Sequence, residues 1–213
     1  IFKYYFSSME FYICTSFFYI FNYINYKIKY KKRYLMKNIL TNNKAKNKII
    51  SEMIRVNQAG EYGAQKIYEG QLAVLKNDKT IKKMSEQEKK HLETFNKILI
   101  KRGIRPTALS PFWDLGGYLL GVTTALIDRK AAMACTVAVE EVIEEHYKDQ
   151  QNILKKDNTE KELIKIIKKF REEEIEHKDI ALEHNAQDLK GYQLMTKGIK
   201  TITKLAIFLS KKI

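Results

Sequence analysis

Two short motifs and two isolated glutamates in this chain have the residue types and spacing of a metal-binding site. Each motif is Glu-x-x-His, one ending at His91 and the other at His177. Four carboxylates and two imidazoles form a complete ligand set for two iron ions in four-helix bundles that supply one Glu from each of two helices and Glu-x-x-His from each of the other two. The candidate ligands are Glu61, Glu88, His91, Glu140, Glu174 and His177.

The positions of these residues along the chain predict that they meet at one level. In an antiparallel helical hairpin, residues at the same height are equidistant from the turn. Glu61 and Glu88 are equidistant from a point beside the polar segment 76–79, and Glu140 and Glu174 are equidistant from Asp157. Glu-x-x-His alone is a weak motif that arises by chance, but two matched turn midpoints are a separate condition. Within each motif, the three-residue step places both side chains on one helix face.

The ligand types favour iron or manganese over a structural zinc ion. The set contains oxygen and nitrogen donors and no thiolate. We expect Glu88 and Glu174 to bridge the two ions, Glu61 and His91 to complete one ion, and Glu140 and His177 to complete the other. The neighbouring acidic residues of the run 172–176 are expected to lie on a solvated face.

Helical periodicity predicts the elements that position these residues. The chain has only two prolines and nine glycines and is rich in Glu, Lys, Ile and Leu, which favours an all-α fold. Gly103, followed by Pro106, is typical of a helix end. The predicted helices cover residues 49–75, 80–101, 131–155, 160–187 and 193–212.

The segment between the two hairpins, residues 105–131, has two interpretations. It is apolar from Trp113 to Leu126 except for Asp114, and it is too short to span a bilayer. It is either a crossover helix packed on the bundle or an amphipathic element in the membrane interface, assisted by Tyr118 and the basic last helix.

The charge of the chain is unevenly distributed. Of the formal net charge of +14, residues 1–50 carry ten Lys or Arg and one Glu, which leaves +5 for the rest. The charges of this remainder are interleaved as on solvated helix faces, and no aromatic-basic groove motif accompanies them, so we expect no nucleic-acid binding. Cys14 and Cys135 fit neither a disulfide framework nor a CxxC metal pair.

Residues 1–48 differ from the rest and form a basic, aromatic-rich extension. Its apolar stretch Phe11–Ile24 has 14 residues, fewer than the ~20 that a spanning helix needs. Three interpretations remain open: a targeting segment or membrane anchor, a disordered tail, and upstream sequence foreign to the natural protein. We therefore predict two regions, 1–48 and a helical domain over 49–213.

Several segments resemble one family, the demethoxyubiquinone hydroxylases of ubiquinone biosynthesis. The similarity runs from about Ile54 to the C-terminus and includes the segments 55–64, 67–71, 87–91, 133–141 and 170–177. The resemblance implies a ferritin-like di-iron mono-oxygenase that hydroxylates a polyprenyl demethoxybenzoquinol with O2. Carried over residue by residue, the family's ligands fall on the same six residues that the spacing selects.

The resemblance also implies partners and a location. It implies a peripheral membrane protein, on the matrix face of the mitochondrial inner membrane or the cytoplasmic face of a bacterial membrane. It further suggests a lipid-binding partner protein and a homo-oligomer. It implies that electrons derived from NADH reach the di-iron centre. Since no GxGxxG nucleotide-binding motif is present, the electrons are expected to arrive through the quinone itself or from a partner. The family commonly has Asp-His where this chain has Asn57-Gln58, so side-chain orientation or proton delivery near Glu61 is expected to differ.

Three other residues are candidates for supporting roles. Tyr62 and Tyr147 either hydrogen-bond ligand carboxylates or simply pack. His146 either supports the site, contacts the quinone or is a polar surface residue. His184 is expected at a helix end.

A competing hypothesis is a ferritin-like bundle that stores iron or scavenges peroxide without hydroxylating a quinol. The rubredoxin-like CxxC pair common among scavenging relatives is absent from the sequence. A metal-free, membrane-associated helical scaffold is a third hypothesis.

Overall fold

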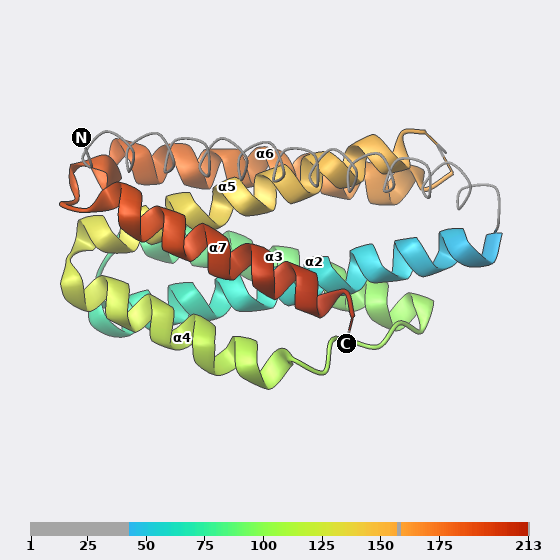
Figure 1. Cartoon of the computed structure of the whole chain (residues 1–213), viewed down its shortest axis with the longest axis horizontal. Helices are drawn as coiled ribbons and strands as arrows, with labels where there is room; N and C mark the ends of the chain where they lie inside the picture. Colours follow the sequence, from blue (N-terminus) through green and yellow to red (C-terminus); the bar gives the residue numbers. More distant parts are fainter. Residues whose placement is uncertain (1–42, 157–158, 213) are drawn as a thin grey trace, which may run out of the picture. The chain divides into compact units, whose positions relative to one another are not determined.

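The computed structural model describes residues 43–156 and 159–212, and every regular element within them is helical (Figure 1). This confirms the predicted all-α class. The α-helices are α2 (Asn43–Val74), α3 (Lys79–Arg102), α4 (Ser110–Ile127), α5 (Arg129–Leu154), α6 (Lys161–Glu183) and α7 (Tyr192–Ser210), with a short 3-10 helix η1 (Ala186–Asp188) before α7.

The chain divides into two compact units, residues 1–49 and 50–213. The described part of the first unit is residues 43–49, which form the start of α2. The apolar stretch Phe11–Ile24 lies outside the described residues, and the boundary at residue 48 remains a prediction. The arrangement described below is that of the second unit.

The first hairpin joins α2 to α3 through a short turn whose ends are well defined. Asp78 caps α3, and its carboxylate accepts hydrogen bonds from the amides of Thr80 and Ile81 at 2.9 and 3.1 Å. This satisfies amide groups that a helix start leaves unpaired. Gly103 ends α3 in the left-handed conformation at φ 61°, where glycine carries no steric penalty. Both signals lie where the sequence predicted the ends of this helix.

The second hairpin joins α5 to α6, and Asp157 at its predicted midpoint lies outside the described residues. The predicted helix over 160–187 is too long, because α6 ends at Glu183. Asn185 adopts the left-handed conformation at φ 62°, which interrupts the α-helix before η1 begins. His184 is the residue that caps α6, as predicted.

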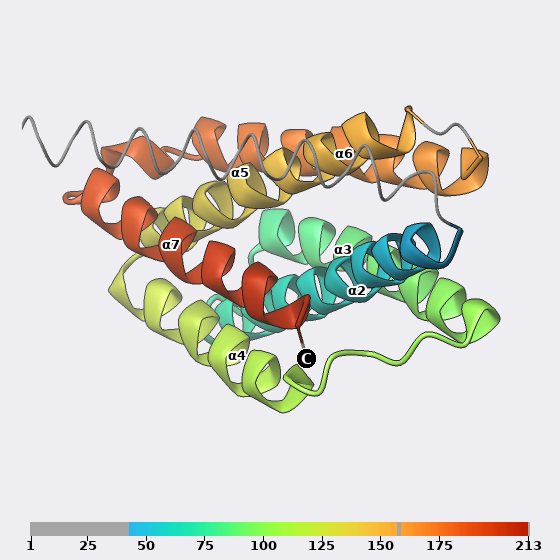
Figure 2. The same ribbon diagram turned by 45° about the vertical axis from the view of Figure 1, so that its right-hand side comes forward.

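Helix α4 connects the hairpins and lies directly against α2 (Figure 2). Gly117 and Gly121 of α4 and Gly70 of α2 bring the two backbones together, since a Cβ at any of them would come within 3.0 Å of backbone atoms of the other helix. The structure therefore supports the predicted packed crossover helix. The lack of side chains at these positions is what permits the close approach.

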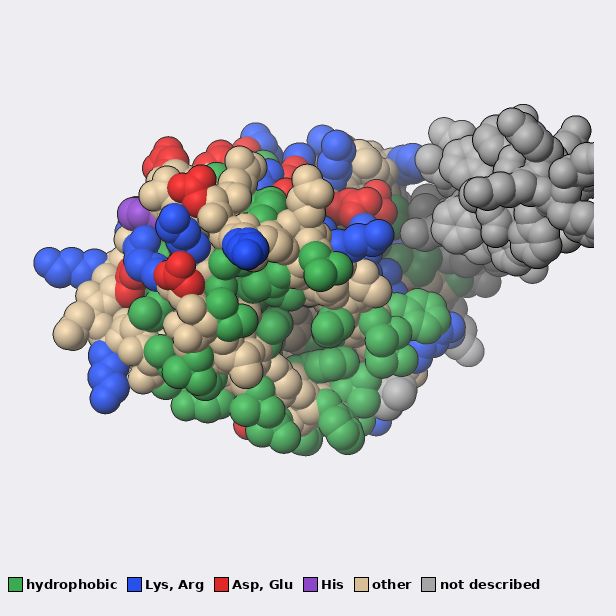
Figure 3. Space-filling model, turned by 60° about the vertical axis from the view of Figure 1, so that its left-hand side comes forward, with side chains coloured by type: hydrophobic (Ala, Val, Ile, Leu, Met, Phe, Trp, Pro, Cys, Tyr) green, Lys and Arg blue, Asp and Glu red, His purple; other side chains and the backbone are tan. Residues whose placement is uncertain are grey.

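The outer surfaces of α4 and α7 expose large apolar side chains, and Figure 3 shows hydrophobic groups gathered on one face. Among the described residues, no helix combines the length and hydropathy needed to cross a membrane. The exposed apolar residues of these two helices are Phe112, Leu115, Tyr118, Leu119, Leu126, Ile127, Leu194, Ile202, Leu205 and Phe208.

Candidate metal centre

Four helices bring the six predicted ligands to one buried position. Helices α2 and α5 each supply one glutamate, and α3 and α6 each supply a Glu-x-x-His pair on one face. None of the six residues is more than 1% exposed. They are Glu61 on α2, Glu88 and His91 on α3, Glu140 on α5, and Glu174 and His177 on α6.

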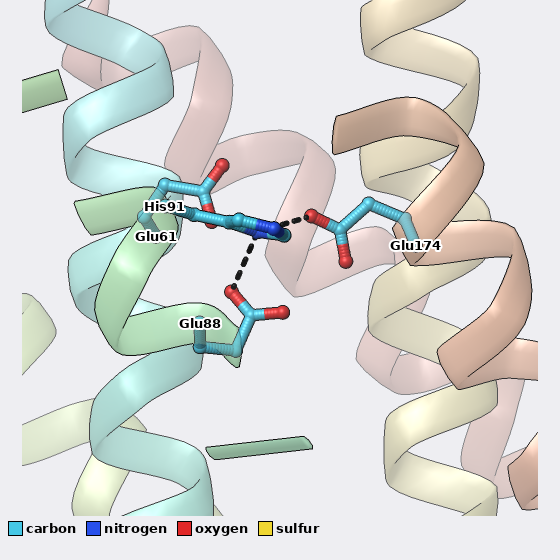
Figure 4. A group of neighbouring side chains, drawn as sticks. All are labelled: Glu61, Glu88, His91 and Glu174. Atoms are coloured by element: carbon cyan, nitrogen blue, oxygen red, sulfur yellow. Dashed lines mark ion pairs between the residues drawn. The ribbon is translucent and has the colours of Figure 1, made fainter. Parts of the chain in front are cut away.

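These residues form two overlapping groups whose candidate ligand atoms lie within 4.8 Å of one another. One group adds Glu61 and His91 to a shared pair of glutamates, and the other adds Glu140 and His177 to the same pair. The shared residues are Glu88 and Glu174. Figure 4 shows the first group, with carboxylates from three helices directed toward the imidazole of His91.

The Nδ1 atom of each histidine faces the carboxylates. His91 Nδ1 lies 3.2 Å from Glu174 Oε1 and 3.5 Å from Glu61 Oε2. His177 Nδ1 lies 3.0 Å from Glu88 Oε1 and 3.3 Å from Glu174 Oε2. The two imidazoles therefore contact different oxygens of Glu174.

The inward-facing atoms of this cluster fit a pair of metal ions. Buried polar atoms normally have hydrogen-bond partners. Eight buried atoms of the six residues make no hydrogen bond within the described part of the chain: both oxygens of each shared glutamate, one oxygen of each lone glutamate and both Nδ1 atoms. Four buried carboxylates are costly without a compensating cation. Hard oxygen donors with two imidazole nitrogens suit iron or manganese.

The pKa values of the two lone glutamates and the pKa of Glu88 shift in opposite directions. Burial and the Glu88 charge raise the pKa of Glu61, and burial and the Glu174 charge raise the pKa of Glu140. Burial also acts to raise the pKa of Glu88, but the imidazoles of His177 and His91 close to its carboxylate outweigh it and lower the value. Burial opposes charge on His177, yet Glu174 and Glu88 raise its pKa to about 11. A proton and a metal ion would thus compete for the same atoms.

Two tyrosines hydrogen-bond the lone glutamates, and one of them was not predicted. Tyr147 donates to Glu61 Oε1, which is one of the contacts considered from the sequence. Tyr68 donates to Glu140 Oε1 at 2.9 Å and was missed, although it lies two turns beyond Glu61 on the same helix face. Tyr62 instead donates to Asp114 of α4 at 3.0 Å, so it makes no such contact.

The outer nitrogen of each histidine also has a partner that sequence reasoning missed. His91 Nε2 lies 2.7 Å from Glu173 Oε2, and His177 Nε2 lies 3.3 Å from Gln87 Oε1. Glu173 was expected on a solvated face, but only 23% of its side chain is exposed. Its position immediately before the second motif was the available signal.

Near Glu61, polar side chains of α2 and α5 form an uncharged network. Asn57 Nδ2 donates to Gln150 Oε1 at 2.9 Å, and Gln150 Nε2 lies 2.6 Å from Asn57 Oδ1. Gln150 Nε2 also lies 2.8 Å from His146 Nε2. Gln58 donates to Asn96 at 3.1 Å and so points toward α3. The amide pair thus links α2 to α5 next to the centre without adding charge.

An apolar cavity of about 260 Å3 reaches one side of the centre. Its walls come from α2, α4, α5 and α7, and its lining includes Glu61, Tyr147 and His146. Trp113 and Ile202 contribute apolar surface from α4 and α7. The cavity therefore joins the predicted ligand Glu61 to the helices that carry the exposed apolar face.

Comparison with known proteins agrees with this geometry. A family model described as ubiquinone biosynthesis protein COQ7 matches residues 48–210. The "NADPH-dependent 3-demethoxyubiquinone 3-hydroxylase, mitochondrial" of Bos taurus is 47% identical over 169 residues, 77% of this chain and 78% of the relative. The "3-demethoxyubiquinol 3-hydroxylase" of Rhodospirillum rubrum is 45% identical over 169 residues, 78% of this chain and 79% of the relative.

A more distant relative shows the same coverage. The "5-demethoxyubiquinone hydroxylase, mitochondrial" of Saccharomyces cerevisiae is 40% identical over 182 residues, 77% of this chain and 78% of the relative. With a family match over most of its length and relatives well above 30% identity, this chain belongs to the family of the ubiquinone biosynthesis protein COQ7.

Proposed function

We propose that this chain is an O2-dependent 3-demethoxyubiquinol 3-hydroxylase of ubiquinone biosynthesis. The observation that carries the proposal is the pair of buried ligand groups that share Glu88 and Glu174. Family membership supplies the substrate class, which ligand spacing cannot supply. The helices that hold the site, two antiparallel hairpins joined by a crossover helix, support a ferritin-like four-helix bundle.

The six residues would hold two iron ions, with two glutamates shared between the ions and two residues specific to each ion. Glu88 and Glu174 would bridge the ions, because each belongs to both ligand groups. Glu61 with His91 would complete one position, and the other lone glutamate with the second histidine would complete the other. The eight buried atoms without hydrogen bonds are the donors that this arrangement requires.

Iron bound there would supply the redox chemistry that activates O2. The overall reaction places one oxygen atom on the quinol ring and reduces the other to water, which requires two electrons and two protons. The Bos taurus relative is named NADPH-dependent, which supports a reduced nicotinamide as the source, and the quinol itself is the alternative donor.

The residues around the cavity would bind and orient the ring. Its apolar walls exclude water and suit an isoprenoid quinol. Glu61 and Tyr147 line its inner end, so a ring bound there would lie beside the Glu61 position. His146 lines the same cavity, which supports a substrate contact for this residue.

The exposed face of α4 and α7 supports a peripheral contact with a membrane, where this substrate is dissolved. Apolar side chains at a lipid surface are stabilised by burial in the interface. Two lysines of α7 pair with α5, since Lys200 contacts Glu141 and Lys204 lies 2.9 Å from Glu145. The apolar side chains would therefore provide more of the affinity than the charges of these two lysines. The Bos taurus relative is named mitochondrial and another relative comes from Rhodospirillum rubrum, so both a mitochondrial and a bacterial membrane remain part of the proposal. A lipid-binding partner and a homo-oligomer remain part of the proposal.

The test combines metal analysis with turnover. Glu174→Ala is expected to abolish binding of both ions and hydroxylation together, because this residue contributes to both groups. The matched control is Glu176→Ala on the same helix, whose side chain is 50% exposed and pairs only loosely with Lys83 at 3.5 Å. Oxygen uptake that depends on added demethoxyquinol supports mono-oxygenation. Oxygen uptake that does not change when the quinol is added would favour iron storage or peroxide scavenging. Full activity of Glu174→Ala would refute the ligand assignment.

A further inference from the structure

The two ligand groups, which we call the two halves of the metal centre, have matching neighbours: one half contains Glu61 and His91, and the other contains Glu140 and His177. Each lone glutamate is followed seven residues later by a tyrosine, Tyr68 after Glu61 and Tyr147 after Glu140. Seven residues are two helical turns, so each tyrosine lies on the same face as its glutamate. Tyr68 donates to Glu140 and Tyr147 donates to Glu61, so each tyrosine serves the opposite half. The tyrosine contacts therefore do not distinguish the halves.

The residue immediately before each Glu-x-x-His motif follows the same crossed pattern. Gln87 accepts a hydrogen bond from His177 Nε2 with its amide oxygen, at 3.3 Å. Glu173 contacts His91 Nε2 with a carboxylate oxygen, at 2.7 Å. At these matched positions, one half has a neutral amide and the other has a carboxylate at a shorter distance.

This difference has a direct consequence for metal binding. A histidine that donates its outer N–H to a carboxylate is held in one tautomer and becomes a more basic ligand at its other nitrogen. An amide oxygen also selects the tautomer but adds no charge, and charge-assisted hydrogen bonds are shorter and stronger. The inward nitrogen of His91 is therefore the stronger donor of the two.

We propose that Glu173 makes the position formed by Glu61 and His91 the tighter of the two metal-binding positions, so that a divalent ion fills it before the position at His177. The inference rests on the proposed di-metal centre and adds a difference between its halves. Glu173 acts through His91 and is thus a positioning residue.

The lysine that pairs with Glu173 does not neutralise the charge that Glu173 presents to His91. Lys169 Nζ lies 3.7 Å from Glu173 Oε1, but the lysine side chain is 69% exposed and its charge is screened by solvent. The contact with His91 uses the other carboxylate oxygen and is 1 Å shorter.

The tighter position is also the one that the cavity reaches. The cavity lining includes Glu61 and Tyr147, whereas Glu140 and Tyr68 of the other half do not line it. Glu173 would therefore secure the ion beside the bound ring.

The test is a titration of the metal-stripped full chain with Co2+. Calorimetry measures the affinity of each binding step, and visible absorption reports the ligand field of the bound ion. Wild type is expected to bind two ions in two resolved steps. Glu173→Gln should weaken the tighter step about 10- to 100-fold and change the weaker step by less than about threefold. Glu172→Gln is the matched control, since it removes the same charge one residue away from a side chain that is 65% exposed, and should leave both steps unchanged. Gln87→Glu should tighten the weaker step.

The possible failures are distinguishable. A wild-type chain that binds fewer than two ions would refute the di-metal centre itself, and this inference with it. Two ions bound with equal affinity, or a Glu173→Gln variant that weakens both steps equally or only the second, would overturn the inference alone. Should Glu173→Gln not fold, Gln87→Glu decides, since an unchanged weaker step in that variant contradicts the proposed role of the outer charge.

Discussion

Helix α4 meets α2 so closely at Gly121 that a side chain there has no space. A Cβ on Gly121 would lie 2.0 Å from Ile67 O and 2.9 Å from Gln71 N. An ordinary contact begins near 3.4 Å, so alanine would require the backbones to separate by more than 1 Å locally. Overpacking of this kind costs about 1–3 kcal/mol, and backbone atoms yield less than side chains. Replacing glycine by alanine in a helix gains only about 1 kcal/mol.

Gly121→Ala is therefore expected to lower the free energy of unfolding by up to about 2 kcal/mol, measured by urea denaturation. The matched control is Gly198→Ala in α7, where a Cβ meets nothing within 4 Å and the residue is exposed. That variant should gain about 0.5–1 kcal/mol. The opposite signs separate close packing from helix propensity. A Gly121→Ala protein as stable as the control variant would refute the packing argument for α4.

Three further predictions follow from the site and its supports. Gly60 lines the cavity and has free space around it, so a leucine side chain there would occupy part of the cavity. Gly60→Leu should therefore raise KM for the quinol while both metal ions are retained. An unchanged KM would contradict the assigned binding site. Leu119→Lys on the exposed face should reduce binding to phospholipid vesicles in a flotation assay, and undiminished flotation would exclude this face from the contact. Asp78→Asn keeps the helix cap but removes the pair with Arg129, at a cost of roughly 1 kcal/mol or less at neutral pH. Burial acts to raise the pKa of Asp78, but Arg129 and backbone amides lower it below the ordinary 3.8. The stabilisation by the ion pair is therefore present above pH 3.8 and is lost as the pH falls through the pKa of Asp78 in the folded protein. Thermal melts of the two proteins should converge in that acidic range, and a constant difference would contradict the ion-pair origin.

The positions of the six site residues could be predicted because they depend on helical repeat and distance from a turn. Residues at one height in a hairpin can meet when both lie on the faces between the helices, and residues three apart on one helix share such a face. The neighbours of the ligands depend instead on how each helix is rotated about its axis. The seven-residue spacing places Tyr68 on the same helix face as Glu61, but only the structure shows that its hydroxyl reaches Glu140 while Tyr62 contacts Asp114.

Local composition also misled one prediction about Glu173. An acidic run normally indicates a solvated face, yet this residue faces His91. The early end of α6 had a similar cause, since the hydrophobic pattern continued past Glu183 while Asn185 adopted a left-handed conformation. Asparagine tolerates that conformation without requiring it.

The most direct test of the central claim is the mass of the product formed under 18O2. The chain should be loaded with Fe2+ to two ions per chain and given a short-tailed demethoxyquinol with a reductant. The proposed function predicts a hydroxylated quinol that carries one 18O atom and is absent with Glu174→Ala. A product without 18O, or one formed equally by that variant, would contradict the proposal that this buried carboxylate and histidine centre performs the hydroxylation.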